Sequence, residues 1–403
     1  MTEKQIIHVN PSVNYIFAGA GTASTTDAIL VFLFPVLLLT YYDIPLAQVT
    51  LIFTAMRVIS PVFTYMAGHL VDTQNKKALI IGLYSCAVIP ILILIVAYLV
   101  DDPSMQVALS FASGILIALV FSSTLVQEPY IVDNSTHPQK SLMKFYSIGF
   151  TCLFLGSIGM TIYFAFVEHV LPLLIIKSIT DFCALSFIIF GLLKRDTPLP
   201  PAPVREEEQF RGPKTTTYVP LVFSLLTFSL MLALLSYYAS YFIPIMVNER
   251  FLQMSIVSAS FVFINGANGL VNFVLSKKFP RVMPVSVTYI LTLLSAGLFV
   301  SFYKFTGSLG VFGIWLALYS LVYAVVLTYG KINMLLISPA HMKGRVRAVL
   351  QALMNIFAGV LAYAFLQFFN NDPFSVGIVA ACVVIITGTL CTGGIAISRR
   401  SSP

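Results

Sequence analysis

Two residues of opposite charge lie inside the first two long apolar runs of this sequence, where a charge is costly. At a helical rise of 1.5 Å per residue, Asp27 would lie about 20 Å from the inner end of the first run. Arg57 would lie about 22 Å from Asp72, at the inner end of the second run. A charge at the centre of a bilayer costs roughly 2.5–3.5 kcal/mol, so such residues usually face a cavity or each other. We therefore expect Asp27 to face Arg57 across a wet cavity. Protonation of Asp27 would release Arg57 there; the alternative is a permanently closed pair that fixes helix packing.

A second pair of buried charges, Lys177 and Asp181, is four residues apart in the sixth apolar run. Side chains at this spacing meet on one face of a helix, so the two can form an ion pair. Lys177 is about two helical turns from the end of its run and could extend towards the surface. We expect a structural pair here.

Polar and aromatic side chains recur at helical spacing in the second half of the chain. Amides cost energy in lipid unless they are paired or wet, which favours faces that point inwards. These residues predict a roomy amphipathic cavity, although a single aromatic stripe can equally be packing. The candidates for its lining are Tyr237, Tyr241, Asn265, Asn268, Trp315, Tyr319, Tyr323, Gln351 and Asn355.

Composition indicates that lipid is the solvent of this chain. Of its 403 residues, 58% are apolar or aromatic and only 10% are charged, whereas roughly a quarter of the residues in soluble domains are charged. The mean hydropathy is +0.92. Twelve apolar segments of sufficient length predict an all-α polytopic membrane protein. Their expected spans are 14–40, 47–71, 78–99, 105–130, 144–167, 171–193, 217–244, 254–276, 283–303, 309–335, 345–369 and 374–397.

The distribution of Lys and Arg predicts how these helices are oriented. With the N-terminus inside the cell, nineteen of the 23 basic residues fall at the inner ends or in the inner connections. By the positive-inside rule, both termini are expected to be cytoplasmic. The net charge of +7 is therefore a signal of topology, and we expect no nucleic-acid partner.

One connection differs from the others and divides the chain into two halves. The segment "KRDTPLPPAPVREEEQFRGPKTTT" begins at residue 194 and is long, charged and rich in Pro, as in a flexible linker. We expect a six-helix bundle over 1–193, a cytoplasmic linker over 194–216 and a second six-helix bundle over 217–403. A faint repeat supports this division, since "GHLVDTQNKK" after the second helix has an echo, "NGLVNFVLSKK", after the eighth.

Twelve helices in two halves, with a Gly-x-Leu-Val-Asp-x-x-Asn-Lys-Lys motif after the second helix, resemble the major facilitator superfamily. The motif consists of Gly68, Leu70, Val71, Asp72, Asn75, Lys76 and Lys77. It departs from the family pattern at Val71, Thr73 and Asn75. The stretch "PAHMKGRVRAVLQALMNIFAGV" at the eleventh helix is similar to the macrolide-efflux and siderophore-exporter branch of drug:proton antiporters. However, Ser157 stands where many antiporters carry Pro in helix 5.

The resemblance implies a role for the motif between helices 2 and 3. In the family this cluster acts as a cytoplasmic gate that closes the inner side in the outward-facing state, which here would involve Gly68, Asp72, Asn75, Lys76 and Lys77. The alternative is a solvated turn whose lysines serve only topology.

The resemblance also implies a function. We expect a secondary transporter that moves a small organic molecule by alternating access, as a proton-coupled exporter of amphipathic compounds such as drugs, siderophores or metabolites. Three alternatives stay open. The protein could import a small organic acid, it could translocate lipids, or it could be a sensor or assembly protein that transports nothing. No catalytic motif occurs, and we expect no enzyme activity, no metal and no cofactor beyond a proton gradient. The expected setting is a monomer in a bacterial inner membrane.

Overall fold

The computed structural model describes residues 10–121, 124–135, 138–167, 169–194, 218–277, 285–305, 307–337 and 343–400. The regular elements within these ranges are helices, and ten of them are long and apolar enough to cross a membrane by length and composition. The predicted all-α, multi-pass architecture is therefore confirmed for the described chain. The linker 194–216 lies, apart from Lys194, outside the described residues, so its boundaries stay a prediction.

The N-terminal bundle contains the elements from residue 11 to residue 193. They are α1 (Pro11–Ala28), η1 (Ile29–Leu33), α2 (Phe34–Thr40), α3 (Leu46–Thr73), α4 (Lys76–Leu99), α5 (Pro103–Phe121), α6 (Thr124–Asp133), α7 (Pro138–Phe166) and α8 (Leu171–Leu193). Most of the expected spans agree with these helices to within a few residues. The expected span 105–130 corresponds instead to two helices, α5 and α6.

The C-terminal bundle contains the elements from residue 218 onwards. They are α9 (Tyr218–Tyr237), η2 (Tyr238–Phe242), α10 (Ile243–Phe251), α11 (Met254–Lys277), α12 (Val285–Phe305), α13 (Leu309–Ile337), α14 (Lys343–Phe369) and α15 (Pro373–Arg400). The expected end of the seventh span, at residue 244, was too early, because the helix continues through a π turn to Phe251. Pro244 does not end it, because the π turn before it accommodates the hydrogen bond that proline cannot donate.

The first helix of each bundle is interrupted in the same way. A five-residue π turn, η1 or η2, precedes a short helix whose second residue is proline, Pro35 in α2 and Pro244 in α10. Proline removes a backbone donor, and a wider turn accommodates the lost hydrogen bond. The two π turns also contact each other. The two halves thus share a local backbone feature at matching positions.

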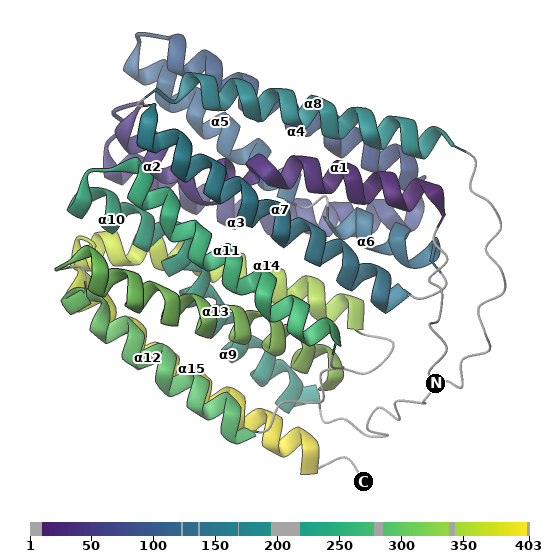
Figure 1. Cartoon of the computed structure of the whole chain (residues 1–403). Coiled ribbons are helices and arrows are strands. Elements are labelled where there is room, and N and C mark those ends of the chain that lie inside the picture. Colours follow the sequence, from purple (N-terminus) through teal and green to yellow (C-terminus); the bar gives the residue numbers. More distant parts are fainter. Residues whose placement is uncertain are drawn as a thin grey trace, which may run out of the picture.

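The two bundles pack against each other through α3 with α14 and through α7 with α11 (Figure 1). Hydrogen bonds between described residues of the two bundles lie both near the end remote from the termini and near the middle of the helices. Thr40 with Asn248 and Thr50 with Tyr241 are of the first kind, and Ser60 with Asn355 is of the second. These bonds hold the bundles together from the middle of the molecule to the end opposite the termini.

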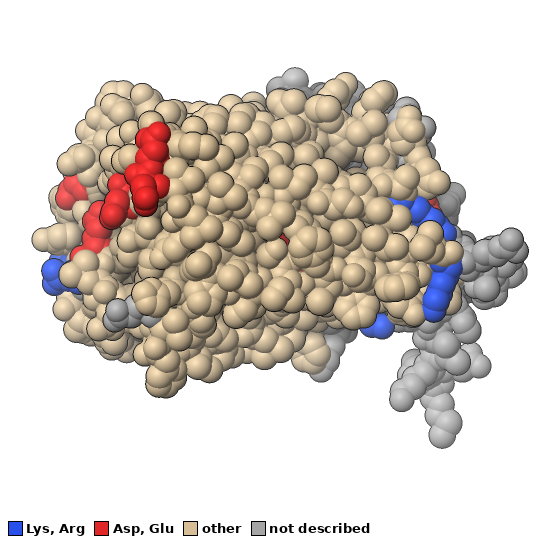
Figure 2. All heavy atoms as spheres, turned by 90° about the horizontal axis from the view of Figure 1, so that it is seen from above, with Lys and Arg blue, Asp and Glu red and all other residues tan. Residues whose placement is uncertain are grey.

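Charge is distributed unevenly along the helix direction (Figure 2). Most of the visible Asp and Glu gather at the end remote from the termini, and most of the visible Lys and Arg lie at the end that carries the termini. The broad belt between them shows almost no charge. This pattern is the one that a membrane-spanning protein with basic inner loops shows. The cytoplasmic location of the termini stays a prediction.

Close packing between α1 and α8 sets the position of the charged residues described below. A Cβ atom on Gly19 would lie 2.8 Å from the side chain of Ile188 and 3.1 Å from the carbonyl oxygen of Ala184. Glycine at this position therefore lets the two helices approach closely. The buried Val13, Ile16 and Phe17 of α1 belong to the same apolar core as Ala184 and Ile188.

Candidate functional site

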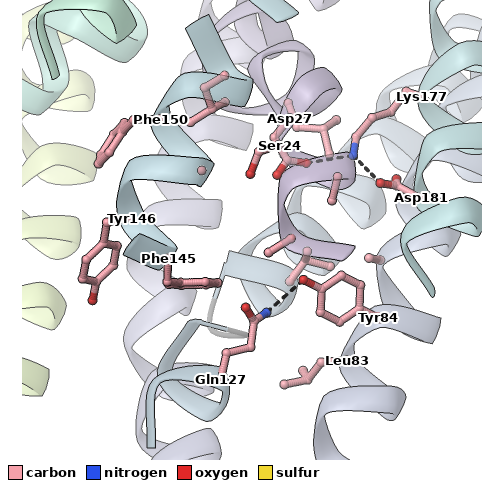
Figure 3. Close-up of a pocket in the computed structure, with 17 residues that line it drawn as sticks. Ser24, Asp27, Leu83, Tyr84, Gln127, Phe145, Tyr146, Phe150, Lys177 and Asp181 are labelled. Carbon is pink, nitrogen blue, oxygen red and sulfur yellow. Dashed lines mark hydrogen bonds and ion pairs between the residues drawn. The ribbon is translucent and has the colours of Figure 1, made fainter. Parts of the chain in front are cut away.

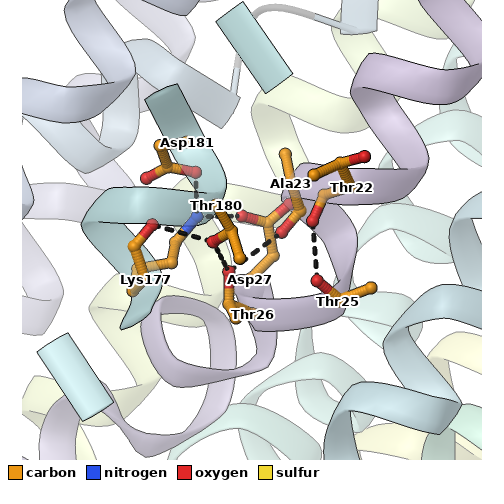
Figure 4. A network of polar contacts seen from close by, with 8 residues as sticks. All are labelled: Thr22, Ala23, Thr25, Thr26, Asp27, Lys177, Thr180 and Asp181. Carbon is orange, nitrogen blue, oxygen red and sulfur yellow. Dashed lines mark hydrogen bonds and ion pairs between the residues drawn. The ribbon is translucent and has the colours of Figure 1, made fainter. Parts of the chain in front are cut away.

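Three charged side chains of the N-terminal bundle form one cluster, which we call the acidic cluster. The ammonium group of Lys177 lies 2.8 Å from Asp27 Oδ1 and 2.5 Å from Asp181 Oδ1 (Figure 4). The predicted contact of Lys177 with Asp181 is thus confirmed, but Asp27 joins it from α1. The side chains of Lys177 and Asp181 are 2% and 3% exposed, whereas that of Asp27 is 32% exposed.

Threonines brace the backbone on which the acidic cluster is built. The hydroxyl groups of Thr26 and Thr180 are 2.6 Å apart and join α1 to α8 one residue from Asp27. Thr180 also donates to the carbonyl oxygen of Lys177 at 2.8 Å. These bonds hold the two helices in register, so the carboxylate of one meets the ammonium of the other.

The acidic cluster is one positive charge short of neutrality when all three groups are ionised. One ammonium faces two carboxylates, and Asp181 Oδ2 is buried without a hydrogen-bond partner among the described residues. A buried acceptor of this kind is costly unless a donor reaches it. The arrangement can therefore take up one proton, or one further hydrogen-bonding cation.

A cavity of about 220 Å³ adjoins the acidic cluster inside the N-terminal bundle (Figure 3). Asp27, Lys177 and Asp181 lie at one side of it, and the Tyr84 hydroxyl accepts a hydrogen bond from Gln127 at another. The other lining residues are mainly apolar or aromatic. They include Ala20, Ala23, Leu30, Leu83, Phe145, Tyr146, Phe150 and Leu153. The cavity thus combines a negative cluster with aromatic walls.

The expected contact between Asp27 and Arg57 was wrong. Arg57 donates to Asn355 Oδ1 at 3.0 Å and to Ser240 Oγ at 2.9 Å, and its guanidinium lies over the ring of Phe53 at 5.0 Å. The helices α1 and α3 follow each other in the chain, but α1 packs mainly on α7 and α8 while α3 packs mainly on α5 and α14, so equal depth did not bring the two side chains together. Asp27 turns to α8, while Arg57 turns to the C-terminal bundle. We call the contact of Arg57 with Ser240 and Asn355 the arginine contact.

Three predicted cavity residues lie at the interface between the bundles. The hydroxyl of Tyr241 bonds that of Thr50, Asn265 donates to Ser157 Oγ at 2.9 Å, and Asn355 also donates to Ser60 at 3.2 Å. These residues are buried in this conformation. Two other predicted amides behave differently. Asn268 donates to the carbonyl oxygen of Ile264, while its own side-chain oxygen is buried without a partner in the part of the chain that the structure describes. Gln351 on α14 is partly exposed.

The predicted aromatic stripe packs in the core of the C-terminal bundle in this conformation. Trp315, Tyr319 and Tyr323 stack in sequence, and the first two are 1% exposed. Trp315 donates to the carbonyl oxygen of Leu298, and Tyr319 to that of Leu235. Tyr237 is fully buried against Phe365. Their role in lining a substrate path stays a prediction.

Part of the predicted gate motif makes contacts at the end that carries the termini. Lys76 forms an ion pair with Asp133 at 2.5 Å, Lys77 Nζ lies 3.4 Å from the carbonyl oxygen of Lys194, and Asn75 caps α4. Gly68 and Asp72 belong to α3, but their side chains lie outside the described residues. The gate therefore stays a prediction.

The structure adds a buried acid that the sequence analysis missed. Glu128 on α6 is 7% exposed and accepts a hydrogen bond from the hydroxyl of Tyr146 on α7, which lines the cavity. Its signal was present in the sequence, because an acid before Pro129 in an apolar run is as unusual as Asp27. Glu128 lies near the end of the expected span 105–130, where an acid is common, so the sequence analysis did not select it.

Comparison with known proteins identifies the fold. No protein-family model and no curated protein sequence matches this chain. Solved structures match nearly all of it. The human organic anion transporter MFSD10 (TETRAN) is 15% identical with a TM-score of 0.64, and the match covers 94% of this chain and 99% of that one. The POT family transporter PepTSo is 14% identical with a TM-score of 0.68, covering 97% of both chains.

A bacterial homologue of the iron transporter ferroportin, in an outward-facing state, is 13% identical with a TM-score of 0.64. The match covers 96% of this chain and 99% of that one. The chain has the major facilitator fold. At these identities the likeness concerns the fold, and the major facilitator architecture hosts many substrates. The acidic cluster and the arginine contact are therefore interpreted from their own geometry.

Proposed function

We propose that this protein is a secondary transporter, a proton-coupled exporter of small amphipathic molecules that works by alternating access. The observation that carries the proposal is the acidic cluster, in which Asp27 is 32% exposed beside a cavity while Lys177 and Asp181 are sealed. A carboxylate at the edge of such a cluster can exchange a proton with the cavity, and the exchange changes the charge that a substrate meets.

The titratable groups around this exchange are few among the described residues. Asp27 faces Lys177 and Asp181 on α8, and Tyr84 on α4 and Tyr146 on α7 lie on the same cavity. Behind Tyr146 lies the buried carboxylate of Glu128. One proton makes the cluster neutral. A proton-loaded cluster and a substrate-loaded cavity then alternate as the bundles rock, with the substrate leaving the cell as a proton enters.

The arrangement of contacts between the bundles supports the same cycle. The bonds on the side remote from the termini, including the arginine contact, would have to open for a substrate to leave there. In the orientation proposed from the basic residues, the present conformation is closed towards the outside of a bacterial inner membrane. The gate motif near Asp72 would close the opposite side in the other half of the cycle.

Reconstituted vesicles test the proposal. With a pH gradient imposed across the membrane, the wild-type protein should drive the movement of members of an amphipathic compound panel, and dissipating the gradient should stop it. Asp27→Asn should abolish the pH-driven movement while exchange of substrate without a gradient persists. Undiminished pH-driven flux per folded molecule in Asp27→Asn would refute Asp27 as the coupling group.

Import of a small organic acid is a second candidate, and the arginine contact favours it. Arg57 is held by two neutral acceptors and by the face of Phe53. A guanidinium with neutral partners can exchange them for a carboxylate when the bundles part. Uptake of a labelled organic acid that Arg57→Gln abolishes and Asp27→Asn leaves intact would favour this candidate over export.

A further inference from the structure

We propose that the cavity of the N-terminal bundle binds the primary ammonium group of a compact aromatic amine, with Asp27 as the group that receives it. This inference rests on the proposed function and names its substrate class. Four observations carry it: the charge of the acidic cluster, the exposure of Asp27, the unsatisfied oxygen of Asp181, and the aromatic lining of the cavity.

The charge of the acidic cluster selects a cation. Two carboxylates share one ammonium, so the ionised cluster carries one excess negative charge. Among the described residues that line the cavity, Lys177 is the one Lys or Arg. Arg57 is engaged with Ser240 and Asn355 at the interface between the bundles and is not among the lining residues. An anion would therefore meet unbalanced negative charge, while a cation completes the cluster.

The chemistry of the cluster selects a cation that donates hydrogen bonds. Lys177 already presents a primary alkylammonium to this pair of carboxylates, at 2.8 Å and 2.5 Å. Asp181 Oδ2 is buried and has no donor among the described residues, although Asp181 lines the cavity. The ammonium group of a ligand at Asp27 would share the Asp27 carboxylate with Lys177. Lys177 could then shift towards the unsatisfied oxygen of Asp181. A quaternary cation has no N–H and cannot replace the lost bonds.

The walls of the cavity select an aromatic body attached to the ammonium. Phe145 points from α7 into the cavity and the ring of Tyr84 lies across from it, whereas the rings of Tyr146 and Phe150 lie on the far side of α7 (Figure 3). Aromatic faces stabilise both a nearby cation and a stacked ring. The volume of about 220 Å³ is below the roughly 300–1,000 Å³ of pockets for drug-sized ligands. We therefore expect a ligand with one ring and a short chain.

Equilibrium binding to the full-length protein in lipid nanodiscs tests the proposal without any gradient. Calorimetric titration compares 2-phenylethylammonium with three probes of similar shape: its N,N,N-trimethyl analogue, neutral 3-phenylpropanol and anionic 3-phenylpropionate. We expect the primary ammonium to bind about tenfold or more tightly than each of the others, since charge-assisted hydrogen bonds are lost in all three. Equal affinity for the trimethyl or the neutral probe would overturn the proposal.

Two variants of the same chemical change locate the site. Asp27→Asn should reduce the affinity for 2-phenylethylammonium to that of the neutral probe. Asp372→Asn changes an exposed carboxylate between α14 and α15, remote from the cavity, and should leave binding unchanged. Unchanged affinity in Asp27→Asn would refute the site. If Asp27→Asn does not fold, the selectivity of the wild-type protein still decides the question.

The outcome is separable from that of the proposed function. Ammonium binding without pH-driven transport would refute the exporter and leave the binding site standing. pH-driven transport of another compound class, with no ammonium binding, would refute the site and leave the exporter standing.

Discussion

The acidic cluster and the arginine contact both bury a cation in the membrane, but they stabilise it in different ways. Lys177 is held by two carboxylates within one bundle, at 2.8 Å and 2.5 Å. Arg57 is held across two bundles by the neutral oxygens of Ser240 and Asn355 and by the ring of Phe53. One cation is matched by opposite charge, the other by dipoles and an aromatic face.

The difference suggests distinct roles for the two regions. In the proposed cycle, a contact within one bundle would persist while the bundles rock, so the acidic cluster could be strongly charged without hindering that motion. A contact between bundles would have to break in each proposed cycle, so strong pairing there would trap one conformation. Neutral acceptors hold Arg57 more weakly than a carboxylate would. We interpret the acidic cluster as a binding element and the arginine contact as a reversible closure.

The largest expected effect follows from removing the cation of the acidic cluster. Lys177→Met leaves two carboxylates facing each other, and breaking a buried ion pair typically costs roughly 3–5 kcal/mol. We expect a large fall in the unfolding temperature, measured by thermal denaturation in detergent. Adding Asp181→Asn should restore part of it, because one partly exposed carboxylate then remains.

The matched control is the exposed pair at the end that carries the termini. Lys76 and Asp133 have side chains 31% and 53% exposed, and such pairs contribute roughly 0–1 kcal/mol. Lys76→Met should therefore change the unfolding temperature little. Equal shifts for Lys177→Met and Lys76→Met would contradict the distinction between buried and exposed pairs.

A smaller effect is expected at the arginine contact, and it concerns conformation more than stability. Arg57→Gln weakens or removes two hydrogen bonds between the bundles, each worth roughly 1.5–3 kcal/mol when one partner is charged. The population open on the side remote from the termini should rise about tenfold or more. Spin labels at Asp43→Cys and Gln253→Cys, in a background without the native cysteines, should report longer distances across that side.

A neutral contact at the same interface provides the comparison. Thr54 donates to the carbonyl oxygen of Gly359 at 3.1 Å, between the same two helices, α3 and α14. Thr54→Val removes that bond without removing a charge, so its shift in the distance distribution should be smaller. A distribution in Arg57→Gln that matches the wild type would show that the arginine contact does not hold the closed side.

The smallest effect is expected from an exposed carboxylate that belongs to neither region. Asp372 caps α15 by accepting a hydrogen bond from the backbone of Ser375 at 2.8 Å, which lowers the pKa of the carboxyl below its ordinary value of 3.8. The stabilisation is therefore complete above that ordinary value and is lost as the pH falls through the lower folded-state pKa.

Asp372→Ala should accordingly unfold at a slightly lower temperature than the wild type at pH 6. The gap should close as the pH is lowered below the folded-state pKa, because the wild-type carboxyl is then protonated as well. Thermal scans of both proteins across this range measure the gap. A gap that stays constant down to the most acidic pH would mean that the ionised cap contributes nothing.

An ion pair within one helix could be predicted from the sequence, while an ion pair between two helices could not. Lys177 and Asp181 are four residues apart on one helix, so their contact follows from helical geometry alone. The pairing of Asp27 was predicted with the wrong cation. Depth along a helix follows from counting residues, but the direction of a side chain around the helix axis relative to its neighbours depends on packing. The packing of α1 on α8, close at Gly19 and joined by Thr26 and Thr180 beside Asp27, directs Asp27 towards Lys177.

The sequence by itself determined the solvent, the helices and the fold class of this protein. Apolar runs of bilayer length must form helices, because lipid offers the backbone no other hydrogen-bond partners. The tertiary structure decided which groups each buried charge contacts. Asp27 and Lys177 meet within the first bundle, and Arg57 forms hydrogen bonds from the first bundle to the second. The physical reason is that a charge in a membrane is stabilised only by groups within a few ångströms. Sequence distance says nothing about which groups from other helices come that close.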